Sequence, residues 1–421
     1  MRFYIETLGC KVNQYESRAV AALLTQRGHS EAGRGEPCDA VIVNTCAVTE
    51  TASRRSRQAA RRLKRLFPGA VLAVCGCAGE IEPEAARALG ADIVAGSGAR
   101  REFAESLESF VLDHGFVQKH IATPAPREFE LLPVGATARA RATLKIQDGC
   151  DCFCTYCIIP YARGRSRSIA EDEAVARAAE LARRGFREIV ITGIEICSYG
   201  FDLDGGETLP GLLRAVSEAA PEARIRLGSL EPSRVTEDFV RALRGLPNIC
   251  DHFHMSLQSG SAATLRRMRR KYAPEDFFST VTRLRGAFPN AGVTADVIAG
   301  FPGETEAEFL ETLTFLQKCE FSALHVFPYS IRPGTAAAAM ENQLPNAEKK
   351  ARAEAFRAAG ARTRAGFIEK QLGKTLEVLF EREKGGFSTG HSGNYLEIRE
   401  KITGARGKLL PVVVSGGSII G

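Results

Sequence analysis

Residues 144–161 read LKIQDGCDCFCTYCIIPY, a short apolar run followed by a loop rich in cysteine. In this loop Cys150, Cys154 and Cys157 stand with three and then two residues between successive sulfurs. Three thiolates on so short a loop can hold three corners of a 4Fe-4S cube and leave the fourth iron open to a ligand. Because the loop follows a strand-like run, we expect it at a carboxyl strand end, where α/β proteins bind ligands.

A fourth thiol in the same loop, Cys152, leaves a second interpretation open. Four thiolates arranged as a tetrahedron would suit a structural zinc ion. Zinc sites usually use two separated pairs of ligands, whereas Cys150, Cys152 and Cys154 are alternate residues that would crowd one face of an extended stretch. We therefore expect Cys152 not to be a ligand.

The length and composition predict an ordinary folded protein of two or three domains. The chain has 421 residues, which exceeds the size at which a single core keeps growing. It contains twelve cysteines and opens with a strand-like run rather than a signal peptide, so we expect reduced thiols and metal in the cytoplasm. No apolar stretch approaches the length of a membrane span. The net charge of +6 is too small to establish a polyanionic partner.

The first third of the chain alternates short β-rich runs with helix-like stretches. The runs are residues 3–8, 40–43, 71–74 and 92–94. This βαβ pattern predicts an open parallel sheet with helices on its faces.

Three cysteines follow successive runs of this predicted sheet. Cys10 comes two residues after the first run, and Cys46 and Cys77 come three residues after the second and third. Since ligands bind outside the carboxyl ends of parallel strands, we expect these thiols to converge as a second metal site. Cys75 competes with Cys77, but we prefer Cys77 because it lies in the loop. We expect the other free cysteines to be packing residues, namely Cys38, Cys197, Cys250 and Cys319.

The central region repeats strand and helix six times, which predicts a barrel or partial barrel with its active face at the carboxyl strand ends. The expected strands are residues 144–147, 188–192, 224–228, 252–257, 293–298 and 323–327, with helices such as 171–184 and 304–318 between them.

The cysteine motifs resemble those of a known family. The triad with the aromatic Tyr156 beside its third cysteine resembles the radical S-adenosylmethionine enzymes. The contexts TLGCKVNQYES, NTCAVTETASRRSRQ and VCGCAGE resemble the amino-terminal domain of the methylthiotransferases. This resemblance implies two 4Fe-4S clusters, one on Cys150, Cys154 and Cys157 and an auxiliary one on the three strand-end cysteines.

Four further segments, ITGIEICSYG, SLEPSR, SLQSGS and DVIAGFPGET, resemble regions that hold S-adenosylmethionine in this superfamily. The resemblance implies contacts from Tyr156, Gly193, Glu195, Gln258 and Asp296. A loop cap or a salt bridge is an equal alternative for each of the last three, and GFPGE also reads as a turn that starts a helix.

The tail predicts a small all-β barrel, with β runs at residues 376–380, 395–398 and 409–414. The text VLFEREKGGFSTGHSGNYLEI resembles a TRAM domain, a small RNA-binding barrel. The implied RNA contacts are Lys374, Arg382, Lys384 and His391 to phosphate and Phe387 or Tyr395 to a base, although each also suits a solvated or core position.

Residues 54–65, RRSRQAARRLKR, carry seven Lys or Arg on a predicted helix. Small residues and leucines recur at helical spacing on one side, where they can pack on the sheet: Ala52, Ser56, Ala59, Leu63 and Leu66. The basic faces suit either solvent or an RNA backbone. The same two alternatives, exposure to solvent or contact with RNA, apply to Arg163, Arg165 and Arg167.

The fold class is therefore α/β, with an auxiliary-cluster domain over residues 1–120, a linker at 121–137, a partial-barrel domain at 138–365 and an RNA-binding barrel at 366–421. Proline-containing segments at 123–127 and 132–135 mark the linker.

The resemblance implies methylthiolation of an adenosine beside the tRNA anticodon, with LGCKVNQYES and STGHSGNYLEI pointing to the threonylcarbamoyladenosine branch. Expected partners are the tRNA anticodon stem-loop and an electron donor such as flavodoxin or ferredoxin. Three alternatives stay open: an isopentenyladenosine substrate, an aspartate of a ribosomal protein, and a zinc-stabilised RNA-binding protein without catalysis.

Overall fold

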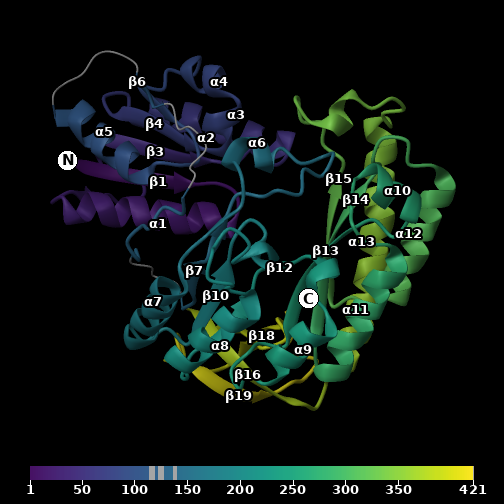
Figure 1. The fold of residues 1–421 in the computed structure, drawn as a ribbon. Helices are drawn as coiled ribbons and strands as arrows, with labels where there is room; N and C mark the ends of the chain where they lie inside the picture. The colour runs from purple at the N-terminus through teal and green to yellow at the C-terminus, as the bar shows by residue number, and fades with distance from the viewer. Residues whose placement is uncertain (113–118, 122–127, 136–139, 421) are drawn as a thin grey trace. The chain divides into compact units, whose positions relative to one another are not determined.

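The computed structural model describes residues 1–112, 119–121, 128–135 and 140–420, and its contacts divide the chain into two compact units (Figure 1). The first unit comprises Met1–Thr137, Gln147–Ile169 and Ile331–Ala338. The second comprises Ala138–Ile146, Ala170–Ser330 and Ala339–Gly421.

The first unit is built on a six-stranded parallel sheet in the order β2-β1-β3-β4-β5-β6, as the strand pattern predicted. Its strands are β1 (Arg2–Thr7), β2 (Ser30–Glu31), β3 (Ala40–Thr45), β4 (Val71–Gly76), β5 (Ile93–Ala95) and β6 (Lys119–Ile121). A short antiparallel pair, β8 (Gln147–Asp148) and β9 (Arg167–Ser168), brackets the cysteine loop.

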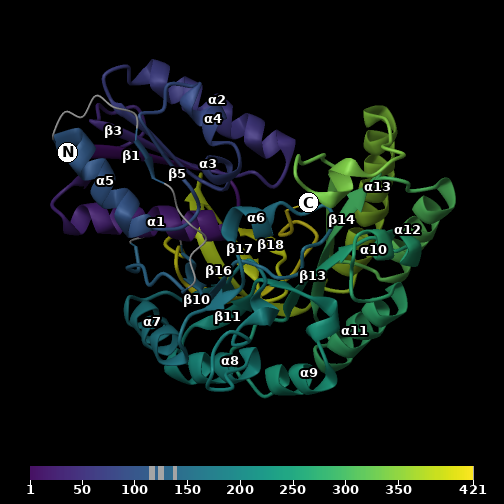
Figure 2. The ribbon, with the colours of Figure 1, turned by 45° about the horizontal axis from the view of Figure 1, so that its top comes forward.

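Helices cover both faces of this sheet (Figure 2). On one face α1 (Lys11–Gln26) and α5 (Arg100–Leu112) share a core with Phe3 and Leu132. On the other face α2 (Glu50–Leu66) and α4 (Pro83–Arg87) pack. Two short helices, α3 (Cys77–Ile81) and α6 (Ile159–Arg163), pack together beside the strand ends.

The predicted linker is described only in part. Residues 123–127 lie outside the described residues. Residues 132–135 have neither helix nor strand, and the buried Leu132 places this segment on the core of the first unit. Gly135 lies so close to α1 that an added Cβ would be 2.3 Å from the Arg18 carbonyl oxygen.

The second unit contains the predicted run of strands and helices, with its strands divided between two parallel sheets. One sheet has the order β11-β10-β7 and the other β12-β13-β14-β15. The strands are β7 (Ala142–Lys145), β10 (Glu188–Thr192), β11 (Arg224–Leu227), β12 (Ser229–Leu230), β13 (His252–Gln258), β14 (Gly292–Ala299) and β15 (Ala323–Pro328).

The intervening helices are α7 (Glu171–Arg183), α8 (Leu209–Ala219), α9 (Glu237–Arg244), α10 (Ala262–Arg267), α11 (Pro274–Ala287), α12 (Glu306–Lys318) and α13 (Asn346–Glu369). Helix α12 begins two residues later than expected because Thr305 caps it: the Thr305 hydroxyl accepts from the Glu308 amide, and the Glu308 carboxylate accepts from the Thr305 amide.

The tail is a four-stranded antiparallel sheet in the order β18-β17-β16-β19. Its strands are β16 (Thr375–Lys384), β17 (Phe387–Ser392), β18 (Glu397–Glu400) and β19 (Leu409–Val413). A turn joins β16 to β17 through Gly385 and Gly386, both at positive φ. Strand β17 was not predicted, because its sequence FSTGHS lacks apolar alternation.

A buried ion cluster joins the tail to the amino-terminal ends of the parallel strands. Glu188 on β10 accepts hydrogen bonds from Arg224 and Arg226 on β11 at 2.6 and 2.8 Å. Their remaining donors reach the carbonyls of His391 and Gly393 in the tail at 2.7 and 2.8 Å. Burial alone would raise the pKa of Glu188, but the two guanidiniums outweigh it and lower this pKa to about 2.

Replacing this carboxylate, Glu188→Gln, should destabilise the chain by about 3 kcal/mol, because two guanidiniums would stay buried without their counter-ion. The measurement is the urea midpoint followed by circular dichroism at neutral pH. Glu222→Gln, which removes an exposed partner of Arg187, should leave the midpoint unchanged. Equal midpoints for both variants would show that the cluster contributes nothing.

Candidate metal centres

The cysteine loop depends on a glycine at its start. Gly149 has a φ of +69°, and a Cβ there would lie 1.9 Å from the Arg165 carbonyl oxygen. The returning chain therefore passes directly over residue 149, and the Cys150 amide donates to the Gly164 carbonyl at 3.1 Å. Only glycine allows this closed loop.

The four loop thiols lie within eight residues of the sequence. Cys154 is buried, while Cys150, Cys152 and Cys157 are half-buried. The Cys152 amide donates to the Cys150 sulfur at 3.4 Å, and a hydrogen bond between the two thiols, together with burial, raises the pKa of Cys150. The geometry keeps Cys152 beside the triad, so its exclusion as a ligand stays a prediction.

The three strand-end cysteines lie at the same edge of the six-stranded sheet. Cys10 precedes α1, Cys46 follows β3, and Cys77 begins α3. A Cβ on Gly9 would lie 3.1 Å from the Cys46 sulfur. Burial raises the pKa of the Cys77 thiol to about 12, and the neighbouring Cys10 and Cys46 thiols add to the shift. The donor set therefore suits a metal that binds thiolate.

Cys75 faces the opposite side of the same sheet. It packs in the core that contains Phe3 and Phe103. Burial raises its pKa to about 11, and the charged group that opposes this shift is Arg100 rather than any other cysteine. Cys75 lies within β4 and in this core, whereas Cys77 begins α3 beyond the end of the strand, which favours Cys77 over Cys75 at the strand-end site.

A buried arginine connects the cysteine loop to the strand-end site. Arg163, at the end of α6, donates to Glu16 on α1 at 2.8 Å and to Asp148 on β8 at 3.1 Å. Its second terminal nitrogen donates to the Asn13 side-chain oxygen at 2.8 Å. The adjoining Ala162 packs against Cys77.

Asn13 joins the two strand ends that precede Cys10 and Cys46. Its amide nitrogen donates to the carbonyls of Leu8 and Thr45, each at 2.8 Å. The sequence analysis quoted the segment that contains Asn13 and Glu16 but did not assign them a role. The available signal was that a neutral polar residue, Asn13, and an acidic residue, Glu16, both lie on the buried side of a helix.

Two further arginines complete the network. Arg100 donates to Glu16 at 2.9 Å, and Arg167 donates to Asp148 at 2.9 Å. Three guanidiniums against two carboxylates leave one net positive charge among these buried groups. A buried positive charge stabilises nearby thiolates. Of the three ambiguous arginines, Arg163 and Arg167 are thus structural, while Arg165 is exposed.

A separate segment of the chain completes this unit. Arg332 is buried and donates to Glu50 at 3.1 Å and to Glu82 at 2.6 Å. Nearby, the Ala337 amide donates to the Thr155 carbonyl inside the cysteine loop at 2.8 Å. The half-buried Tyr156 follows directly. Sequence reasoning missed Arg332, since nothing local relates it to the loop.

In the second unit the expected ligand contacts follow the strands. Gly193 and Glu195 come directly after β10, and the Glu195 carboxylate accepts from the Cys197 amide at 3.0 Å. Burial raises the pKa of Glu195, and the nearby Glu231 adds to this shift. Glu231 pairs with Arg270. The loop-cap alternative thus holds for Glu195.

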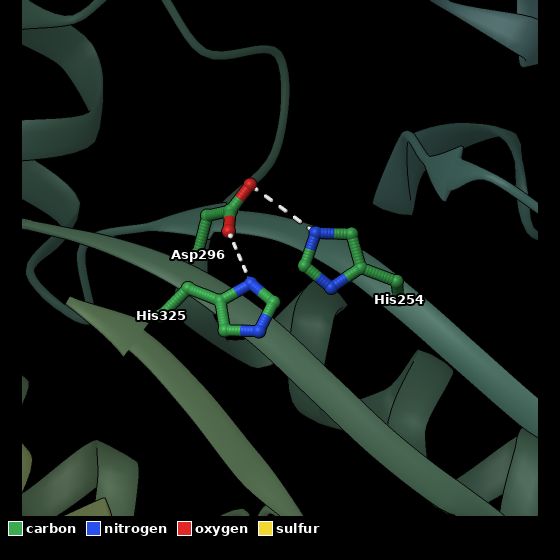
Figure 3. A group of neighbouring side chains, drawn as sticks. All are labelled: His254, Asp296 and His325. Atoms are coloured by element: carbon green, nitrogen blue, oxygen red, sulfur yellow. Dashed lines mark hydrogen bonds and ion pairs between the residues drawn. The ribbon is translucent and has the colours of Figure 1, made fainter. Parts of the chain in front are cut away.

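Gln258 ends β13 with a φ of +67°, where the register between β13 and β14 shifts. Asp296 lies between His254 and His325, which were not predicted (Figure 3). Burial would raise the pKa of Asp296, but hydrogen bonds from both imidazoles hold it well below its usual range.

The turn reading of GFPGE is also supported. Glu304 accepts from the Gly300 amide at 3.0 Å and from Arg352 at 2.8 Å. These bonds close the turn before α12.

The basic residues of helix α2 fall into two groups, one paired with acidic residues and one exposed to solvent. Arg57, Arg62 and Lys64 are in ion pairs with acidic residues of the same unit. The exposed residues are Arg54, Arg55, Arg61 and Arg65. Positions 54, 61 and 65 share one helix face, which suits a phosphate backbone. The predicted buried stripe is confirmed at Ser56, Ala59 and Leu63, whereas the prediction is wrong for Leu66, which is exposed.

In the tail, the partly buried Tyr395 ring is stacked between two histidines. Its ring stacks on His252 and His391 at centroid distances of 4.5 and 4.7 Å, and Arg226 lies 4.8 Å from its centroid. Phe387 is covered by Arg399 at 4.0 Å. Of the predicted phosphate contacts, Lys374 bonds Asn290, Arg382 pairs with Glu397, His391 bonds Glu381 and Lys384 is exposed.

Two family models match the chain. Residues 144–316 match the Radical SAM superfamily, and residues 2–96 match the Uncharacterized protein family UPF0004. Among the described residues, no helix is long and apolar enough to cross a bilayer.

Several characterised proteins are similar over most of their length. Threonylcarbamoyladenosine tRNA methylthiotransferase MtaB of Bacillus subtilis is 38% identical over 93% of this chain and 88% of its own. The protein of the same name from Thermotoga maritima is 36% identical over 90% and 86%. The tRNA-2-methylthio-N(6)-dimethylallyladenosine synthase of Acetivibrio thermocellus is 34% identical over 90% and 80%.

The fold is similar to that of a solved radical S-adenosylmethionine methyltransferase, TsrM from Kitasatospora setae with cobalamin and a 4Fe-4S cluster bound. The TM-score is 0.59 at 14% identity, covering 80% of this chain and 77% of that one. At this identity the likeness concerns the fold alone.

Removal of the connecting guanidinium, Arg163→Met, should destabilise the chain by about 3 kcal/mol, because Glu16 and Asp148 would each lose a buried partner. The urea midpoint measures the loss. Arg165→Ala is the matched control, since Arg165 is 78% exposed and should contribute nothing measurable. A midpoint for the Arg163 variant equal to that of the control would show that the network is not a stability determinant.

Proposed function

Because the chain belongs to the radical S-adenosylmethionine methylthiotransferases, we propose that it acts on threonylcarbamoyladenosine beside the anticodon of tRNA. The net change is replacement of C–H by C–S–CH3 at C2 of the adenine. The substrate assignment draws on the names of similar proteins from Bacillus subtilis and Thermotoga maritima.

The observation that carries this proposal is the presence of two thiol sets in one compact unit. Cys150, Cys154 and Cys157 lie on one loop, and Cys10, Cys46 and Cys77 lie at three parallel strand ends. Each set offers three thiolates, which is one fewer than the irons of a 4Fe-4S cube. We propose that each set holds one such cluster with one open iron.

When bound, the first cluster and S-adenosylmethionine supply the carbon radical that activates an inert C–H bond. The protein's own groups position and enclose the reactants. We propose Tyr156, Gly193, Glu195, Gln258 and Asp296 as contacts to S-adenosylmethionine. Burial raises the pKa of the Cys46 and Cys77 thiols, and the Arg163 guanidinium opposes this shift in both.

The proposed partners are the tRNA anticodon stem-loop and an electron donor such as flavodoxin or ferredoxin. The exposed Arg54, Arg61 and Arg65 offer a charged stripe to the RNA backbone. We propose that the tail sheet contributes through Lys384, which is exposed. The stacked ring of Tyr395 makes Phe387 the better candidate for base contact, once Arg399 moves aside.

A second candidate substrate is dimethylallyladenosine in tRNA, which is favoured by the 34% identity to the Acetivibrio thermocellus synthase. Nucleoside analysis of cellular tRNA after deletion of the gene separates the two. We expect loss of methylthio-threonylcarbamoyladenosine alone. Unchanged levels of that nucleoside, with loss of the dimethylallyl form or of a ribosomal-protein modification, would contradict the assignment.

Substitution of the two thiol sets should have different effects. Cys150→Ala, Cys154→Ala or Cys157→Ala should abolish formation of 5′-deoxyadenosine, because the first cluster would lose a ligand. Cys10→Ala, Cys46→Ala or Cys77→Ala should preserve that cleavage and stop sulfur insertion. Anaerobic iron analysis should fall from about eight to about four irons per chain in either set.

Cys75→Ala and Cys152→Ala serve as matched controls, and both should keep the full iron content. If either loses iron as fully as the assigned ligands do, the ligand assignment at that site is wrong. An iron-free protein that contains zinc would instead support the non-catalytic alternative.

A further inference from the structure

The sheet β12–β15 has one apolar and one polar face. Phe253, Met255 and Val297 are fully buried on the apolar face, where α13 packs on Leu324. Of the alternate residues that form the other face, His252 and Thr294 are buried, Asp296 is partly buried, and His325 and Phe327 are exposed. Parallel sheets are normally buried on both faces, so a polar and accessible face indicates a surface that binds a ligand.

Three side chains on the polar face form a hydrogen-bonded chain (Figure 3). Asp296 on β14 accepts from His254 on β13 and from His325 on β15, each at 3.2 Å and each through a different carboxylate oxygen. Asp296 and His325 are directly paired in the parallel register. The second nitrogen of His254 bonds the Thr294 hydroxyl at 2.9 Å.

This chain of bonds leaves one ring nitrogen available. Both nitrogens of His254 and both oxygens of Asp296 have partners, whereas His325 uses only Nδ1 and has no partner for Nε2 among the described residues. The His325 side chain is 56% exposed. Two residues further along the same face, Phe327 is 43% exposed.

An oriented imidazole beside an open aromatic ring is suited to a nucleoside with an anionic substituent. Asp296 accepts from Nδ1 and so orients the His325 ring, and in an imidazolium Nε2 also donates. Exposed aromatic rings bind splayed-out bases by stacking. The threonylcarbamoyl group ends in a carboxylate, whereas the dimethylallyl group has no polar atom.

Resting on the proposed function, we propose that His325 binds the carboxylate of the threonylcarbamoyl group and that Phe327 packs against the modified adenine. His325 is then a determinant of substrate choice. The carboxylate gains a charge-assisted hydrogen bond from His325 that the dimethylallyl group cannot form, because it has no polar atom.

The test uses cluster-loaded full-length enzyme and anticodon stem-loop RNA with threonylcarbamoyladenosine, either as the free acid or as its methyl ester. Fluorescence anisotropy gives the dissociation constants. Wild type should bind the acid about tenfold to a hundredfold more tightly than the ester, the range for a charge-assisted hydrogen bond. His325→Ala should bind the acid more weakly by the same factor and no longer distinguish the two.

Two controls separate binding from folding. Leu310→Ala changes an exposed side chain on α12 and should leave both dissociation constants unchanged. Circular dichroism and iron content of His325→Ala should match wild type, and His325→Gln, which keeps a donor, should retain part of the preference.

Three results would overturn the proposal: a wild-type enzyme indifferent to the ester, a preference that survives in His325→Ala, or a stoichiometric non-iron metal that Asp296→Asn removes. The last result would make the three residues a cation site. Failure of the proposed function is distinguishable, because wild type would then methylthiolate dimethylallyladenosine RNA and not the threonylcarbamoyl RNA.

Discussion

The buried guanidinium of Arg163 is the constraint on which the first unit depends. Taking a guanidinium out of water is costly unless its donors and its charge are matched, and here Glu16, Asp148 and Asn13 match them. These partners come from a helix of the sheet domain and from the strand before the cysteine loop. Asn13 in turn holds two strand-end carbonyls. One cation therefore links the strand ends that precede Cys10 and Cys46 to the strand that precedes the cysteine loop.

In the second unit the central buried ion is a carboxylate, and two guanidiniums neutralise it. Glu188 is buried at the amino-terminal end of the parallel strands, and Arg224 and Arg226 pair with it while bonding carbonyls of the tail. The tail sheet thereby covers the amino-terminal strand ends. Parallel α/β folds bind ligands at the opposite, carboxyl-terminal strand ends.

Local sequence predicted the features that depend on neighbouring residues. The alternation of strand-like runs with helix-like stretches was enough to predict the parallel sheets, and Cys77 was preferred to Cys75 because it lies in the loop, while Cys75 packs in the core with Phe3. The prediction failed where pattern and burial disagree. Strand β17, which was not predicted, carries buried serines, whereas for Tyr395 the stated alternative of a core position holds, because His252 and His391 stack on its ring.

The sequence by itself determined the cysteine spacing, the βα order and the family, because these are properties of short segments and of similarity along the chain. Only the tertiary structure decided which charges meet. Arg163 reads as one of several basic residues until Glu16 faces it, and His325 reads as an ordinary strand residue until Asp296 orients it. Ion pairs and hydrogen bonds act over a few ångströms between residues far apart in sequence, so their partners are defined only once the chain has folded.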